Sequence, residues 1–142
     1  TRLIFRRFYA TRGLRDSRFR QKVLDAYDYR CAVIGCQLNL VDAAHIIPVS
    51  EEQGNDSITN GIALSPTVHR AFDNGLIFLD TSYFIKLNRH KVEEYENLGI
   101  CDGLDELEGY TNGQILLPAV SKDHPNPSFI ETANKLRGIP GF

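Results

Sequence analysis

Residues 45–75, HIIPVSEEQGNDSITNGIALSPTVHRAFDNG, decide the fold. The segment PTVHRAFDN has the start and stop signals of a helix, with Ser65 as the N-cap, Pro66 at the first helical position and Gly75 just past the end. A polar loop precedes it, and His45 closes a small apolar run before that loop. The segment therefore predicts an apolar strand ending in a histidine, a long loop, and a short helix.

The flanking residues predict a hairpin on the N-terminal side of this segment. CAVIGC (residues 31–36) is typical of a short buried strand, QLNL (37–40) of a turn, and VDAAHI (41–46) of the returning strand. The polar loop SEEQGNDSITN (50–60) then leads to the helix. We expect the end of the returning strand to face that helix.

The rest of the chain predicts a further hairpin and flanking helices. SRFRQKVLDAYDYRC (17–31) has apolar residues at helical spacing, with Ser17 available as an N-cap. The other expected elements are a hairpin of 76–80 and 83–88 turning at 80–82, a short helix at 90–99, an acidic loop at 101–114, a strand at 115–120, and a closing helix in 126–138 capped by Asn126 or Ser128. This order predicts an α+β fold.

Composition indicates one globular domain over residues 1–142. The chain is 42% hydrophobic and 24% charged, which suits a modest core. No apolar run approaches the roughly 20 residues of a membrane span, and no signal peptide is evident. Three cysteines cannot all pair internally, so we expect a cytoplasmic protein. Because the sequence begins with Thr and lacks Met, we expect it to be a fragment of a longer chain.

The net charge of −2 conceals a basic N-terminal block. Residues 1–30 hold nine basic and three acidic side chains, or +6, whereas the other residues hold seven basic and fifteen acidic, or −8. Arginine predominates in the block, and aromatic residues are interleaved with it, a pattern that attracts a phosphate backbone. A solvated helix face is the alternative. The nucleic-acid-binding candidates are Arg15, Arg18, Arg20, Lys22 and, beyond the block, Arg70.

The loop and helix bring three more polar residues toward His45. His69 and Asp73 lie one helical turn apart on one face, so an imidazole nitrogen and a carboxylate oxygen could share a divalent cation. Asn60, on the connection between them and His45, could accept the ring N–H of His45 and fix its free nitrogen. Each feature alone has an ordinary structural explanation, and their occurrence together in this order favours a catalytic site.

Two segments, AAHIIP (43–48) and NGIALSPTVHRAFDNGLIFLD (60–80), resemble the HNH nuclease motif of the ββα-metal fold. The likeness is greatest to the branch found in bacterial restriction and phage-defence enzymes, and covers about residues 17–90. It implies a ββα core in which His45 is the general base, Asn60 orients that base and pins the loop, and His69 and Asp73 bind a metal ion. The ion implied is Mg²⁺, with Mn²⁺ or another divalent ion left open.

The sequence departs from this family's pattern at two places. Many members have an Asp or His ligand directly before the catalytic histidine, where this chain has Ala44. The nearest acid is Asp42, which an offset of three along a regular strand would point to the opposite face, so we expect it to be a ligand only if the strand bulges. Cys31 and Cys36 lack a second cysteine pair, because Ser65 and Val68 occupy that stretch, and no structural zinc is expected.

The resemblance implies a metal-dependent endonuclease that hydrolyses DNA phosphodiester bonds with little sequence specificity of its own. Targeting would come from a further domain, either a modified-base reader or a sensor of a nucleotide second messenger. The alternative is a catalytically silent DNA-binding or interaction module that keeps the scaffold. A homodimer, which would convert nicking into double-strand cleavage, is left open, as is RNA in place of DNA.

Overall fold

The hairpin that carries His45 is formed by two strands far apart in sequence. The computed structural model describes residues 17–142, in which β1 (Asp42–His45) pairs with β2 (Gly61–Leu64) in antiparallel register. His45 lies opposite Gly61, and Asp42 lies opposite Leu64. The polar loop is thus the connection within the hairpin, and the predicted pairing of 31–36 with 41–46 is wrong.

Residues 31–36 form a turn because their own backbone groups pair with one another. The Cys31 N–H donates to the Cys36 carbonyl at 3.0 Å, and the Gly35 N–H donates to the Cys31 carbonyl at 2.8 Å. Gly35 has a φ of +75°, which glycine adopts without strain. These bonds close a turn. The backbone of Ala32 pairs outside that turn, with its N–H donating to the Ala63 carbonyl of β2 at 2.8 Å and its carbonyl accepting the Leu116 N–H at 2.8 Å, so Ala32 contacts β2 and not the strand 41–46.

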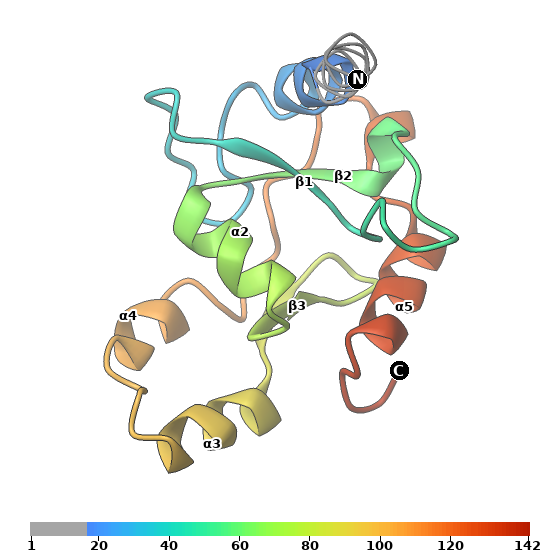
Figure 1. Ribbon diagram of the computed structural model, residues 1–142. Coiled ribbons are helices and arrows are strands. Elements are labelled where there is room, and N and C mark those ends of the chain that lie inside the picture. The colour runs from blue at the N-terminus through green and yellow to red at the C-terminus, as the bar shows by residue number, and fades with distance from the viewer. Residues whose placement is uncertain (1–16) are drawn as a thin grey trace, which may run out of the picture.

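The expected ββα arrangement is present, since helix α2 (Pro66–Asp73) follows β2 directly and packs against β1. Ser65 occupies the N-cap and Pro66 the first turn, as predicted, although the Ser65 side chain makes no capping hydrogen bond. A helix over residues 17–26 covers the other side of the hairpin (Figure 1). Its predicted apolar residues Phe19, Val23, Leu24 and Tyr27 are all buried.

The close packing of that N-terminal helix on the hairpin requires a glycine at the start of β2. A Cβ atom added to Gly61 would lie 2.3 Å from Val23 Cγ2 and 3.1 Å from Phe19 Cζ. Any larger residue would therefore push the helix away from β2. Because Gly61 is the register partner of His45, this contact also fixes the helix over the histidine.

The second half of the chain extends the core beyond α2. The second predicted hairpin is confirmed, and the helices follow it; the elements are β3 (Ile77–Leu79), β4 (Ile85–Leu87), α3 (Arg89–Asn97), α4 (Leu104–Glu108) and α5 (Pro127–Leu136). One hydrophobic cluster runs from the N-terminal helix to α5, which packs against β3. Asn126 caps α5 by accepting the Ser128 N–H at 2.9 Å. The predicted α+β class, with a ββα core flanked by helices and a second hairpin, is confirmed.

Two predictions for the region after α3 are wrong. The acidic loop contains α4, whose Leu104 and Leu107 pack against the core at helical spacing. Residues 115–120 form no strand. Between residues 17 and 142, the only bridge beside them is an isolated one between Phe84 and Gln114, the residue that precedes this range. Among the described residues, no helix has the length and apolar character needed to cross a membrane.

Candidate metal and nuclease site

The strand β1 distributes the candidate site residues between its two faces. Side chains alternate along a strand, so Asp42 and Ala44 point to one side and Ala43 and His45 to the other. Asp42 Oδ2 lies 3.0 Å from His69 Nδ1 on α2. The register from Asp42 to His45 is regular, so the expectation that a bulge is needed to bring Asp42 to the site is wrong. In a regular strand Asp42 points away from the face of His45, and α2 packs on that side of β1, so Asp42 reaches His69.

His69 lies between two carboxylates, one on each edge of its ring. Its Nδ1 contacts Asp42, and its Nε2 lies 3.1 Å from Asp73 Oδ2, one helical turn further along α2. The hydrogen bond to Asp73, aided by that to Asp42 and opposed by partial burial, raises the pKa of His69 from 6.5 to about 9. Without a metal, an imidazolium therefore supplies the positive charge between the two carboxylates at neutral pH.

The donor set suits a divalent ion held by one carboxylate and one ring nitrogen. Neighbouring ligands of an octahedral ion at about 2.1 Å are about 3.0 Å apart, which is the separation of His69 from each carboxylate oxygen. Asp42 and Asp73 use opposite nitrogens, however, and one ion cannot reach both edges of the ring. Accordingly, no three acidic, His or Cys side chains within residues 17–142 form a joint metal site.

His45 is held by contacts from two other segments of the chain. Its ring stacks on Phe19 of the N-terminal helix, with centroids 3.9 Å apart and planes inclined by 6°. Its Nε2 lies 3.0 Å from Asp56 Oδ1, on the polar loop. The His45 and Asp56 side chains are 18% and 30% exposed, so the pair is largely shielded from water. Sequence reasoning missed Asp56, because an acid in a polar loop carries no local signal of its partner.

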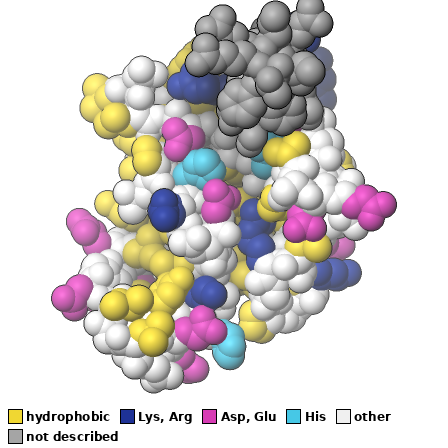
Figure 2. Space-filling view, in the orientation of Figure 1, with side chains coloured by type: hydrophobic (Ala, Val, Ile, Leu, Met, Phe, Trp, Pro, Cys, Tyr) yellow, Lys and Arg dark blue, Asp and Glu magenta, His cyan; other side chains and the backbone are white. Residues whose placement is uncertain are grey.

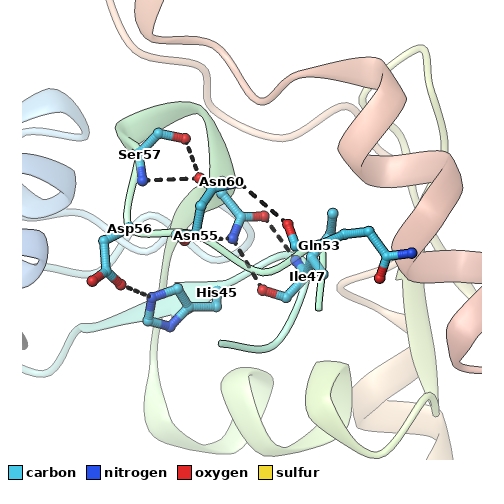
Figure 3. Close-up of polar contacts among 7 residues, drawn as sticks. All are labelled: His45, Ile47, Gln53, Asn55, Asp56, Ser57 and Asn60. Carbon is cyan, nitrogen blue, oxygen red and sulfur yellow. Dashed lines mark hydrogen bonds and ion pairs between the residues drawn. The ribbon is translucent and has the colours of Figure 1, made fainter. Parts of the chain in front are cut away.

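The predicted hydrogen bond between the Asn60 amide and the His45 ring is replaced by bonds that tie the loop to the strand end. Its Oδ1 accepts the Ile47 N–H at 2.8 Å, while its Nδ2 donates to the Ile47 carbonyl at 3.0 Å and to the Asn55 carbonyl at 2.8 Å (Figure 3). Asn60 is fully buried, so these bonds are needed to satisfy its amide. The segment after His45 and the residue before Asp56 are thus fixed to one side chain.

Arg137, from the end of α5, joins the two halves of the site and was not predicted. Its NH1 donates to the Ile46 carbonyl at 2.8 Å, and its NH2 lies 3.9 Å from Asp73 Oδ1. The guanidinium lies 4.5 Å above the Phe72 ring. Burial lowers the pKa of Arg137, and the charge of Asp73 opposes that shift. An arginine 91 positions from its partner gives no sequence signal of this role.

The described part of the chain has a hollow of about 340 Å³ at His45, lined by Phe19, Arg20, Asp42, Ala43, His45 and Val49. It brings a base candidate, a carboxylate and a cation to one opening. Arg70 lines a different hollow, between α2 and helices α3 and α4. Figure 2 shows histidine, acidic and basic side chains together over α2, and hydrophobic side chains gathered over α3 and α4. Arg18 and Lys22 are exposed on the N-terminal helix, and Arg15 lies outside the described residues.

The raised pKa of His69 predicts that the metal-free protein loses stability in mild alkali. Because the folded pKa of about 9 exceeds the unfolded value of 6.5, protonation favours the folded state. The contribution is complete below about pH 6.5 and is lost as pH rises through about 9. Urea unfolding in EDTA should show wild type losing on the order of 1–2 kcal/mol more than His69→Gln over this range. Parallel curves for the two proteins would contradict the assignment.

Comparison with known proteins agrees with the ββα geometry. Residues 31–80 match the model of a family described as HNH endonuclease. Among solved structures, the chain is similar to the modification-dependent TagI restriction endonuclease, with a TM-score of 0.56 and 18% sequence identity. The similarity covers 87% of this chain but only 38% of that one. No curated protein sequence matches the chain.

The family match falls on the hairpin and the helix that follows it. The family match contains β1, the polar loop, β2 and α2, and it ends just after β3. The solved structure has the same fold over most of the described chain. Residues 31–80 are therefore similar to the HNH endonuclease family, and the chain has a fold similar to that of the TagI restriction endonuclease.

Proposed function

We propose that this chain is the cleavage module of a metal-dependent DNA endonuclease. The observation that carries the proposal is the hollow in which His45, Asp42 and Arg20 meet. A phosphodiester group there would have a base for its attacking water, a carboxylate that can bind a metal ion, and a cation for its charge. The HNH match over residues 31–80 supports the same reaction class.

In the proposed reaction His45 removes a proton from the water that attacks phosphorus. The new P–O bond forms as the ester bond to the leaving oxygen breaks, and that oxygen takes a proton from solvent. His45 afterwards returns its proton to solvent. Phe19 holds the ring plane through the stacking contact, and its burial keeps water from that face. Arg20 is exposed at the same hollow, where its guanidinium can bind a phosphate oxygen.

Of the two edges of the His69 ring, the one at which Nδ1 meets Asp42 is the more favourable metal-binding site. Asp42 lines the hollow that contains His45, whereas Asp73 faces Arg137, which already balances part of its charge. Asp73 would then accept the Nε2–H of His69 and orient the ring. Mg²⁺ suits an edge with few protein ligands, since it retains several waters, and Mn²⁺ is an alternative. Such an ion would neutralise charge on the scissile phosphate and the leaving oxygen.

The N-terminal helix provides the proposed nucleic-acid surface. Arg18, Arg20 and Lys22 are exposed on it, and Arg20 extends this surface to the hollow. The acidic helices α3 and α4 lie at the other end of the molecule, beyond α2 (Figure 1). This separation keeps their negative charge away from a phosphate backbone bound near His45. Arg70 lies on the side of α2 that faces these helices, so its role in DNA binding is the weakest of the proposed set.

Targeting would come from another domain of a longer protein. The TagI structure is that of a modification-dependent restriction enzyme, and its chain is much longer than the part covered here. A reader of modified bases is therefore the partner we favour, in a cytoplasmic restriction or phage-defence enzyme. The hollow contains contacts for backbone phosphates rather than for base edges, which fits cleavage without its own sequence preference. A homodimer would allow both strands to be cut.

Plasmid cleavage tests the proposed function and separates it from a silent binding module. Wild type should nick supercoiled DNA with Mg²⁺ or Mn²⁺ and not in EDTA, and His45→Ala should lower the rate by about 10²- to 10⁴-fold because the general base is lost. His90→Ala is the matched control, since His90 is exposed and lies outside the site. Binding of DNA by a folded wild-type protein that never cuts it would favour the silent module.

Metal affinity tests which carboxylate holds the ion. Titration of Mn²⁺, followed by the loss of its free electron paramagnetic resonance signal, should show the largest loss of affinity for Asp42→Asn and His69→Gln. Asp73→Asn should weaken binding by only about tenfold, as expected for a residue that orients a ligand. If Asp73→Asn abolished binding and Asp42→Asn left it unchanged, the ion would lie on the other edge of the ring.

A further inference from the structure

The contact between His45 and Asp56 bears directly on which nitrogen of the proposed base is free. Asp56 Oδ1 lies 3.0 Å from His45 Nε2. An ionised carboxylate can only accept a hydrogen bond, so the proton of a neutral imidazole must lie on Nε2 when this bond is made. The lone pair is then on Nδ1. The two contacts fix different properties of the ring. Stacking on Phe19 fixes the plane of the imidazole, and the hydrogen bond to Asp56 fixes which edge of the ring faces the loop.

The polar loop places Asp56 at this position through bonds on both sides of it. The carbonyl of Asn55, the preceding residue, accepts a hydrogen bond from Asn60. The N–H of Ser57, the following residue, donates to Asn55 Oδ1 at 3.0 Å (Figure 3). Asn60 also holds both backbone groups of Ile47, two residues beyond His45. The buried Asn60 amide therefore holds both the residue before Asp56 and the segment that follows His45.

The loop could not take this course with a side chain at residue 54. A Cβ atom added to Gly54 would lie 2.1 Å from the Pro48 carbonyl oxygen, well inside contact distance. The loop thus folds back on the residues that follow His45, and this return brings Asp56 beside the ring. Partial shielding of both side chains makes their hydrogen bond stronger than that of an exposed pair.

We propose that Asp56 is a positioning residue that keeps the proton of neutral His45 on Nε2 and so makes Nδ1 the atom that accepts the proton from the attacking water. This inference rests on the proposed nuclease function for its catalytic meaning. When Nδ1 takes the proton, the resulting imidazolium keeps its Nε2–H on Asp56, whose negative charge stabilises it. The P–O bonds formed and broken, and the return of the proton to solvent, are unchanged.

The first test reads the tautomer directly and requires no activity. Nitrogen-15 NMR of the full chain at mildly alkaline pH, where free imidazole is neutral, should show His45 with Nε2 protonated and Nδ1 bare. His45→Ala assigns the signals, which is practical because the chain has four histidines. In Asp56→Asn, the amide can donate to Nε2 as well as accept from it, so the Nδ1–H form should appear beside the Nε2–H form. A wild-type Nδ1–H tautomer, or one unchanged in Asp56→Asn, would overturn the proposal.

The second test asks whether that tautomer controls cleavage. Single-turnover cleavage by Asp56→Asn should fall by about 10²- to 10⁴-fold, with Mn²⁺ and DNA affinities unchanged. Glu52→Gln, an exposed acid in the same loop, is the matched control and should stay within about twofold of wild type. Equal rates for wild type and Asp56→Asn would reject the catalytic role. Absence of cleavage by the wild type would reject the proposed function instead, and the tautomer would still decide the role of Asp56.

Discussion

The structure depends most on the buried amide of Asn60. β1 and β2 are separated by a long polar loop, and the loop can close into a hairpin only if its backbone groups find partners away from water. Asn60 supplies three of these bonds, two to Ile47 and one to Asn55. It stands directly before β2, where it also sets the start of the pairing with β1. One side chain thus fixes the strand register, the course of the loop, and the place of the acid that contacts His45.

The alternation of side chains along β1 explains how a short strand can serve two chemical roles. His45 turns toward the N-terminal helix and the loop, where a stacking ring and a carboxylate hold it. Asp42 turns toward α2, where it meets His69. The hairpin lies between these two helices, and both side chains still line one hollow at its edge. In the proposed reaction, the base and the metal-binding group would act on one phosphate while each keeps its own supporting contacts. Arg137 links the two faces through Ile46 and Asp73.

Sequence patterns predicted the parts of this molecule that are encoded locally. The α2 helix has its cap, proline and glycine within eleven residues, and the N-terminal helix has apolar residues at helical spacing, so both were predicted correctly. The strand that pairs with β1 was predicted wrongly, because the apolar run 31–36 has the composition of a strand. Its backbone instead closes a turn through bonds among Cys31, Gly35 and Cys36. The contacts of Asp56 and Arg137 join residues 11 and 91 positions apart, and only the folded chain brings them together. Asn60 was named as a candidate site residue, but the hydrogen bonds of its amide go to Ile47 and Asn55 and not to the His45 ring.

If Asn60 acts on the proposed base through Asp56, the two residues form one functional unit, which a double-mutant cycle of single-turnover DNA cleavage rates would detect. Asn60→Asp keeps the acceptor for the Ile47 N–H and removes both donated bonds, so the loop loses its hold on Asn55. Residues that act as one unit have strongly non-additive effects on rate. With all variants shown to be folded, we expect Asn60→Asp, Asp56→Asn and the double variant to be slowed to a similar extent. If the losses instead multiplied in the double variant, Asn60 would act on cleavage independently of Asp56.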